Sequence, residues 1–242
     1  MHTIILKSTD RINNATTAND AQFYIDWGSI LEDGKYRVNY SICKQLKPIT
    51  EIPWVFRVQS PTPTVPTTVD GFTLTNTNVS MIADGVRENV FEFRGNSFLT
   101  INVPTPVNST KTFWVMIPNI TLANNNTFSS RRMPVWFNGT IFLRASVNFG
   151  VSGGGDVISS VAQTSGVWKF YAITTTATQT KIYVDGVLVT SMNVTWGGDT
   201  AVINFGAYLG ASFLTGLMDD MRLYSSTLTS TDISEIYSRT LL

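Results

Sequence analysis

Residues 181–190 read Lys181-Ile182-Tyr183-Val184-Asp185-Gly186-Val187-Leu188-Val189-Thr190, and this stretch decides the fold class. An Asp-Gly pair stands between two runs rich in β-branched and aromatic residues. Such a pair is favoured in two-residue hairpin loops, because it tolerates the positive φ angles that the turn requires. The stretch therefore predicts a tight β-hairpin.

The strand pattern continues on both sides of this hairpin. Residues 112–117 are apolar on both faces and predict a central strand, whereas Phe91 and Phe93 alternate with polar neighbours and predict a half-buried one. Two further half-buried strands are predicted near the start of the chain, over 21–27 and 35–42. More strands are expected at 141–147, 168–173, 201–209 and 217–224.

A helix is predicted only near the end of the chain. Thr229-Ser230-Thr231-Asp232 has the pattern of a helix N-cap with an acidic residue three positions later, and apolar residues at helical spacing follow it. Many short strands with one terminal helix indicate an all-β protein with an antiparallel β-sandwich.

A proline-rich stretch suggests a division of the chain. Residues 60–68 contain three prolines, which disfavour both a helix and a central strand. We therefore expect a β-rich amino-terminal segment over 1–59, an extended linker over 60–68 and a sandwich domain over 69–242. The alternative is that 60–68 form an edge loop within a single domain.

The composition argues against several functional classes. Charged residues make up only 14% of the 242 residues, and 17 Lys and Arg offset 17 Asp and Glu. Nucleic-acid binding needs a concentrated positive face, and the only basic doublet is Arg131-Arg132. The single Cys43 cannot form an intramolecular disulfide. No apolar run is long enough for a signal peptide or a membrane span, so we expect no membrane insertion and synthesis in the cytoplasm.

The titratable residues disfavour an enzyme. The only histidine is His2, which removes Ser-His-Asp and Cys-His catalysis and multi-histidine metal sites. Glycoside hydrolysis needs two nearby carboxylates, and the nearest approach to such a pair is Glu88 with Glu92. We expect two solvated carboxylates there, no catalytic residue and no organic cofactor.

Five stretches follow one another in a recognisable order from about Val69 onward. They are 91–101 (FEFRGNSFLTI), 112–115 (TFWV), 166–172 (GVWKFYA), 182–186 (IYVDG) and 216–224 (GLMDDMRLY). In these stretches and their order the chain resembles the laminin-G-like, concanavalin A-like jelly-roll superfamily of lectins and glucanases. The resemblance implies an antiparallel jelly roll, but this fold carries lectins, adhesion modules, glycosidases and structural domains alike.

The opening of the chain resembles another group of proteins. Ile4-Ile5-Leu6-Lys7-Ser8-Thr9-Asp10-Arg11 is similar to the first strand of minor virion proteins from large DNA viruses and virophages. This resemblance implies a non-enzymatic virion protein, a minor capsid or surface/fibre protein made in the host cytoplasm. Its jelly roll would bind host-surface glycan or a neighbouring capsid protein, and it could form a homo-oligomer. The alternative is a carbohydrate-binding or adhesion module of a cellular protein.

Asp219 is the one candidate metal ligand. On an unbroken strand over 217–224, its side chain would share the inward face with Met221 and Leu223, and a buried carboxylate must be hydrogen-bonded or bind a cation. It is thus either a Ca²⁺ ligand, as in some relatives, or an acceptor of backbone N–H groups, which we favour. Many relatives carry an acidic residue where this chain has Arg94, which weakens the calcium interpretation.

In folds of this kind, sugars bind to loops at one edge of the sandwich, where an aromatic ring lies beside Asn or Asp. Trp196 and Asp199, within a glycine-containing loop, have the most suitable chemistry. The alternative for Trp196 is a packing role in a Gly-rich turn. The other candidate glycan-binding residues are Asn125, Trp136 and Asn138.

Overall fold

A computed structural model describes residues 21–30, 36–44, 54–58, 64–120, 125–137, 141–150, 152–200 and 202–240. The chain divides into two compact units, residues 1–52 and 53–242, and each is described by itself. In the first unit, β1 (Ala21–Ile30) pairs antiparallel with β2 (Tyr36–Lys44). The register pairs Phe23 with Ile42 and Trp27 with Val38, so the two strands predicted for this part of the chain form one hairpin.

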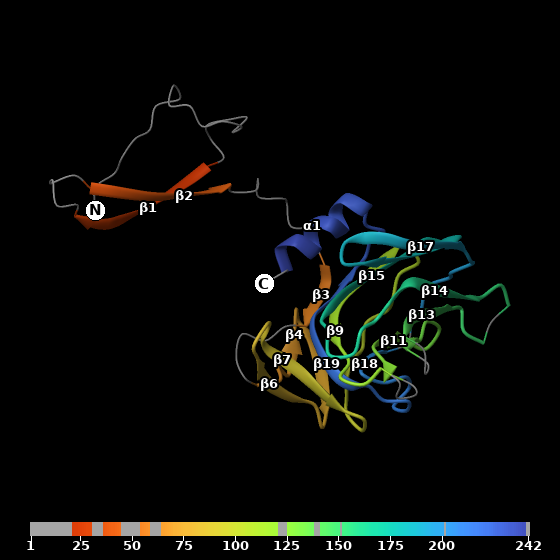
Figure 1. The fold of residues 1–242 in the computed structure, drawn as a ribbon. Helices are drawn as coiled ribbons and strands as arrows, with labels where there is room; N and C mark the ends of the chain where they lie inside the picture. The colour runs from red at the N-terminus through yellow and green to blue at the C-terminus, as the bar shows by residue number, and fades with distance from the viewer. Residues whose placement is uncertain are drawn as a thin grey trace. The chain divides into compact units, whose positions relative to one another are not determined.

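The described residues of the second unit form three antiparallel sheets and one helix (Figure 1). The large sheet has the order β17-β16-β15-β9-β19-β7-β6, and β3 pairs with β19 beyond the end of β7; the smaller sheets are β11-β18-β8-β5-β4 and β10-β12-β13-β14. The bounds are β3 (Trp54–Val58), β4 (Thr68–Val69), β5 (Phe72–Thr77), β6 (Ser80–Asp84), β7 (Glu88–Arg94), β8 (Phe98–Ile101), β9 (Ser109–Met116), β10 (Asn125–Asn126), β11 (Phe128–Ser130), β12 (Val135–Phe137), β13 (Phe142–Val147), β14 (Gly155–Ala162), β15 (Lys169–Thr175), β16 (Gln179–Val184), β17 (Val187–Asn193), β18 (Ile203–Phe205), β19 (Thr215–Tyr224) and α1 (Ser230–Thr240).

Aromatic rings join the large sheet to the two smaller ones. The ring of Phe113 on β9 stacks on Tyr171 of β15, with 5.8 Å between centroids, and lies 6.1 Å from Phe128 of β11. Phe137 of β12 meets Tyr171 edge-on at 5.8 Å. All four side chains are fully buried. Two layers that share one apolar core make a β-sandwich, which confirms the predicted fold class.

Helix α1 covers the opposite face of the large sheet. Side chains alternate along a strand, so Trp114 points away from the core that holds Phe113. Its ring stacks on Tyr237 of α1 with 5.7 Å between centroids, and its Nε1 donates to the Thr240 hydroxyl at 2.9 Å. Strand β9 is thus buried on both faces, which confirms the prediction of a central strand.

The predicted turn and cap are also present. Strands β16 and β17 form a hairpin in which Asp185 and Gly186 have φ angles of 49° and 80°. At the start of α1, the Thr229 hydroxyl accepts a hydrogen bond from the Asp232 amide, and the Asp232 carboxylate accepts one from the Thr229 amide. These two local signals are confirmed because nearest neighbours determine both.

The structure differs from the expected strands and boundaries in two places. Residues 54–58, grouped above with the amino-terminal segment, form β3 of the large sheet, and Val58 is fully buried. Within 201–209 only Ile203–Phe205 form a strand. Gly206 ends it with a φ of 78°, at a place where a Cβ atom would lie 2.1 Å from the Phe93 ring. Of the expected linker, residues 60–63 lie outside the described residues.

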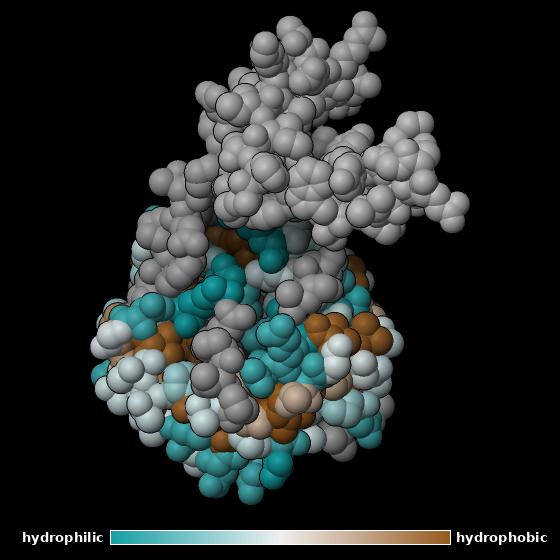
Figure 2. Space-filling model, turned by 90° about the vertical axis from the view of Figure 1, so that its left-hand side faces the viewer, coloured by the Kyte–Doolittle hydropathy of each residue, from teal (hydrophilic) through white to brown (hydrophobic). Residues whose placement is uncertain are grey.

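The surface of the second unit is mixed in polarity on the side that carries β6 and β7. Figure 2 shows hydrophobic residues there in separate small areas between hydrophilic ones. No helix in the described part of the chain is both long enough and apolar enough to span a membrane.

Candidate functional site

Asp219 lies on the outer face of the large sheet, under α1, so the prediction that it shares a face with Met221 and Leu223 is wrong. It pairs in register with Trp114, which contacts the helix. Asp220 has a φ of 47°, and the register shifts between Asp219 and Arg222, which is a β-bulge. An extra residue in one strand reverses the alternation of side chains, and this turns Asp219 outward.

The carboxylate of Asp219 is bound by Arg87. Its Oδ2 accepts a hydrogen bond from Nε of Arg87 at 3.0 Å and lies 2.9 Å from Nη2 in an ion pair, and both side chains are almost fully buried. The guanidinium group also lies 4.1 Å from the centre of the Trp114 ring and donates to the Thr240 carbonyl oxygen at 2.9 Å. Arg87 thus ties the sheet to the end of α1.

A calcium ion does not fit this arrangement. Arg87 already supplies the positive charge next to Asp219, and Oδ1, which has no side-chain partner among the described residues, would offer a single ligand atom. Calcium takes six to eight oxygen ligands. Within the described ranges, no three His, Cys, Asp or Glu side chains gather at one place. Burial raises the pKa of Asp219, as expected of a carboxylate enclosed under a helix.

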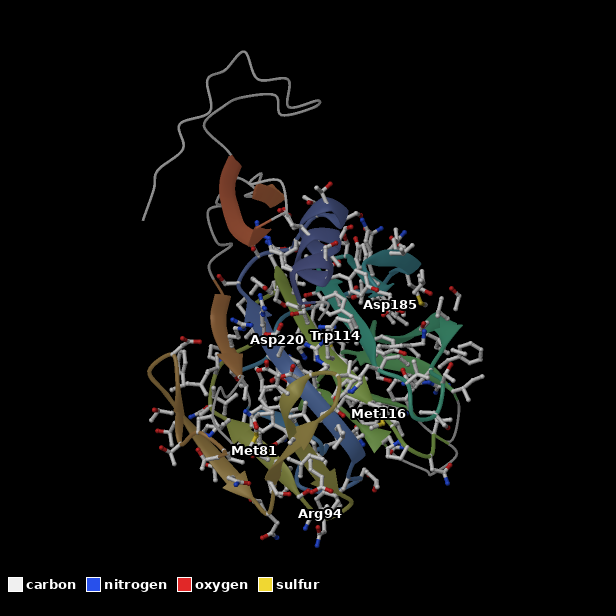
Figure 3. The ribbon with its side chains drawn as sticks, turned by 60° about the vertical axis from the view of Figure 1, so that its left-hand side comes forward. Met81, Arg94, Trp114, Met116, Asp185 and Asp220 are labelled. Atoms are coloured by element: carbon white, nitrogen blue, oxygen red, sulfur yellow. The ribbon has the colours of Figure 1, made fainter. Side chains whose placement is uncertain are left out.

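Asp220, the next residue of β19, is also buried. Two nitrogens of Arg222 donate to its two oxygens at 2.8 and 2.6 Å, and Nε of Arg57 donates to Oδ1 at 2.6 Å. Burial alone would raise the pKa of Asp220, but the bonds and charges of the two arginines hold it below its usual value. Figure 3 shows Asp220 and Trp114 on the sheet beside α1. The bonds of Asp220 with Arg57 on β3 and Arg222 on β19 therefore join these two strands.

Trp196 is buried in the core. Only 1% of its surface is exposed, and its Nε1 donates to the Pro106 carbonyl oxygen at 3.2 Å. Its ring face therefore cannot receive a ligand in this structure. Trp196 has the packing role that was the alternative to glycan binding. Asp199 is also buried, with Oδ2 accepting the Arg132 amide N–H at 2.7 Å.

The remaining candidates differ in their exposure. Asn125 is buried, and its Oδ1 accepts the Thr215 amide N–H at 3.2 Å. Asn138 lies outside the described residues. Trp136 is partly exposed, while its neighbours Val135 and Phe137 on β12 are fully buried. Of the predicted residues, Trp136 alone presents an aromatic ring to solvent in the described parts of the chain.

Two further rings lie next to Trp136. Phe149, in the turn after β13, is 50% exposed and meets Trp136 edge-on, with 6.4 Å between centroids. Tyr208, in the loop after β18, meets Phe149 edge-on at 5.9 Å. The amide of Phe149 donates to the Arg132 carbonyl oxygen, and the hydroxyl of Tyr208 donates to the Arg131 carbonyl oxygen, both at 2.9 Å. The backbone of Phe149 and the side chain of Tyr208 are therefore both fastened to the backbone of the neighbouring turn.

Polar groups lie beside these rings. Trp136 pairs in register with Arg144 of β13, whose Nη1 donates to Asp156 of β14 at 3.0 Å. These side chains are 29% and 42% exposed, and Ser146 also donates to Asp156. We call Trp136, Arg144, Phe149, Asp156 and Tyr208 the Trp136 surface.

This combination suits a sugar. Ring faces bury the C–H groups of a pyranose or furanose, while a carboxylate accepts and a guanidinium donates hydrogen bonds to its hydroxyls. Sequence reasoning found only Trp136 because the other members lie 8 to 72 positions further along the chain. One usable signal was Phe149, an aromatic residue between Asn148 and Gly150, where a turn exposes it.

The pair of acidic residues considered for glycoside hydrolysis lies on β7. Glu92 accepts hydrogen bonds from Arg94 at 2.6 Å and from Ser80 at 2.8 Å, and Arg94 holds its pKa below the usual value. Glu88 is exposed and has a φ of 61°. The acid partner in this reaction needs a raised pKa, and Glu92 shows the opposite shift.

Comparison with known proteins agrees with this architecture. A family model described as the concanavalin A-like lectin/glucanases superfamily (Laminin_G_3) matches residues 93–234, which is more than half of the chain. No curated protein matches the chain.

Solved structures share the fold at low sequence identity. Domain 4 of AbnA, a GH43 extracellular arabinanase from Geobacillus stearothermophilus, in complex with arabinotriose, is 15% identical, with a TM-score of 0.61 and coverage of 76% of this chain and 98% of that one. The binding domain of botulinum neurotoxin serotype D is 17% identical, with a TM-score of 0.61 and coverage of 77% and 51%. The binding domain of botulinum neurotoxin DC in complex with SialylT is 12% identical, with the same score and coverage. This chain spans about half the length of the toxin domains.

Proposed function

The chain belongs to the concanavalin A-like lectin/glucanase superfamily, and from this membership we propose that it is a non-catalytic module that binds glycan on the Trp136 surface. The observation that carries the proposal is the run of three rings, Trp136, Phe149 and Tyr208, beside an exposed Arg144–Asp156 pair. Aromatic residues that the fold does not bury need another explanation, and ligand binding is the one that their polar neighbours favour.

The polar neighbours also argue against a purely apolar ligand. An apolar ligand placed over Trp136 would remove water from Arg144 and Asp156 without replacing the lost hydrogen bonds. A saccharide offers hydroxyls to both groups. The arabinanase domain in complex with arabinotriose, which this chain covers over 98% of its length, supports a saccharide as the ligand class.

The test is a glycan array followed by isothermal titration calorimetry on the full-length protein. Trp136→Ala should weaken binding at least about tenfold, which is about 1.4 kcal/mol. Val86→Ala is the matched control, because Val86 is 59% exposed in the turn between β6 and β7, at the far edge of the large sheet. Selective binding that survives Trp136→Ala would contradict the proposed surface, and the absence of binding to any glycan would contradict the function.

Calcium is a second arm of the same assay. Because Arg87 occupies the carboxylate of Asp219, binding should be the same with calcium and with chelator. A loss of glycan binding in chelator would show a metal site that the described residues do not contain.

A finer proposal concerns the setting in which the module works. The Ser8-x-Asp10-Arg11 opening supports a virion-associated role, in which residues 1–52 would attach the chain to the particle and the jelly roll would bind host glycan or a neighbouring virion protein. These opening residues lie outside the described part of the chain. Mass spectrometry of purified particles should detect the chain, and its absence from them would contradict this role.

The alternative is a carbohydrate-binding or adhesion module of a cellular protein, in which the amino-terminal strands contribute to one fold. Deletion of residues 1–52 distinguishes the two, since it leaves β3 paired with β19. A separate attachment segment predicts that the remaining chain unfolds cooperatively with an unchanged midpoint in urea. A large fall in the midpoint would favour a single integrated fold.

A further inference from the structure

A basic doublet borders the Trp136 surface. Arg131 and Arg132 form the turn between β11 and β12, and both side chains are exposed. The turn is closed by two hydrogen bonds of 3.1 Å between the backbones of Ser130 and Met133. The doublet is too short for nucleic-acid binding, and glycan binding by the rings alone leaves it without a role.

The backbone of the doublet is bonded to Tyr208 and Phe149, two of the residues that carry the rings. The carbonyl oxygen of Arg131 accepts the Tyr208 hydroxyl and that of Arg132 accepts the Phe149 amide, both at 2.9 Å. The Arg132 amide in turn donates to buried Asp199 at 2.7 Å. These three bonds hold the two Cα positions next to the rings, so both guanidinium groups can reach a ligand that lies on them.

The acids around the doublet are bound to groups other than its guanidinium groups. Asp156 is bound by Arg144 and Ser146, and Asp199 accepts the backbone amide of Arg132. Within the described residues, neither Arg131 nor Arg132 has a side-chain ion pair. Burial and the negative charge of Asp199 raise the pKa of Tyr208, and the positive charge of Arg131 opposes them, so both charges act at this ring.

An exposed pair of arginines beside an aromatic platform matches one ligand class. A guanidinium group donates two parallel hydrogen bonds to a carboxylate or a sulfate, and such charge-assisted bonds are stronger than those to a neutral hydroxyl. We propose that the Trp136 surface binds an acidic saccharide, with its sugar ring over Trp136 and Phe149 and its anionic group bound by Arg131 and Arg132. This inference rests on the proposed function and specifies its ligand class.

A nucleic acid is the less favoured anionic ligand. Its binding needs positive charge along an extended track, whereas the chain has no net charge and its exposed basic doublet is local. A single anionic group on a sugar needs no more than two guanidinium groups.

The test compares matched acidic and neutral glycans by calorimetry on the full-length protein. The pairs are sialyllactose against lactose, an oligosaccharide of glucuronic acid against one of glucose, and a sulfated against an unsulfated oligosaccharide. We expect at least tenfold tighter binding of the acidic member of a pair, and a loss of affinity as salt rises from 50 to 500 mM. The pair that shows the preference identifies carboxylate or sulfate as the anionic group.

Two double variants separate the doublet from a general charge effect. Arg131→Gln with Arg132→Gln should remove the preference for the acidic glycan and leave the affinity for the neutral one within about twofold. Arg94→Gln with Arg239→Gln removes the same charge from two exposed arginines on β7 and α1, and should change neither affinity. Trp136→Ala should weaken both.

Three results would overturn the inference alone. One is equal binding of the acidic and neutral members of every pair, and another is an acidic preference that survives loss of Arg131 and Arg132. Tight binding of a single-stranded oligonucleotide with no binding of acidic glycans would also overturn it. If no glycan of either kind binds, the proposed function fails and this inference fails with it.

Discussion

Replacement of Lys111 by methionine should stabilise the protein, and the gain should depend on pH. Lys111 lies on β9 and is 1% exposed, between Ile173 of β15 and Leu223 of β19 in the register of the large sheet. Its Nζ has no hydrogen-bond partner among the residues that the structure describes and lies 5.3 Å from the centre of the Phe128 ring. Methionine keeps most of the volume of the side chain and removes the charge.

The magnitude follows from the two pKa values of Lys111. Burial lowers the pKa in the folded protein to about 7, against a weaker opposing effect of Asp199, whereas an unfolded lysine titrates near 10.4. Between these values the unfolded state binds more protons, so the stability of the wild type rises with pH by up to about 1.4 kcal/mol per unit. From pH 7 to pH 9 the free energy of unfolding of the wild type should rise by about 2 kcal/mol from this cause. Lys111→Met should not show this rise.

Urea denaturation at pH 7, 8 and 9 measures this difference directly. The free energy of unfolding of Lys111→Met should exceed that of the wild type most at pH 7, and the excess should shrink by about 2 kcal/mol by pH 9. Lys181→Met is the control for the exchange of lysine for methionine, at a partly exposed position on β16. A difference for Lys111→Met that is constant with pH, or a loss of stability at pH 7, would refute the assignment of a buried neutral amine.

Three other substitutions test the fold. Arg87→Met should cost about 3–5 kcal/mol at pH 7 because it leaves the buried carboxylate of Asp219 without a partner; the cost measured in urea should fall at pH 4, where protonation of this raised-pKa group removes its charge. Thr229→Ala should lower stability by about 0.5–2 kcal/mol through loss of the helix cap, and an unchanged urea midpoint would contradict that role. Gly206→Ala should cost about 3 kcal/mol or more, measured as a lower thermal midpoint, because the new Cβ would meet the Phe93 ring at a position of positive φ.

Local sequence signals predicted the elements that neighbouring residues determine. The Asp185-Gly186 turn, the Thr229 cap and the doubly apolar strand over 112–117 each depend on a few adjacent side chains, and all three are present. The sandwich itself could also be predicted, because the number and patterning of the strands leave few alternatives.

Features that depend on distant residues could not be predicted in this way. The bulge at Asp220 turns Asp219 outward. A prediction that assumes strictly alternating side chains along a strand cannot include such a bulge. Trp196 is buried because its loop folds against Pro106, about ninety positions earlier in the chain. The pairing of β12, β13 and β14 brings Trp136, Arg144 and Asp156 of the Trp136 surface together. This pairing cannot be predicted from any single stretch of the sequence.

The central claim is that a glycan binds over Trp136. The measurement that tests it most directly is a titration of ¹⁵N-labelled full-length protein with the tightest glycan from the array, followed through the indole N–H signals of its six tryptophans. We predict a saturable shift of the Trp136 signal, while the buried indoles of Trp114 and Trp196 stay unchanged. Saturable binding that leaves Trp136 unshifted would contradict the account.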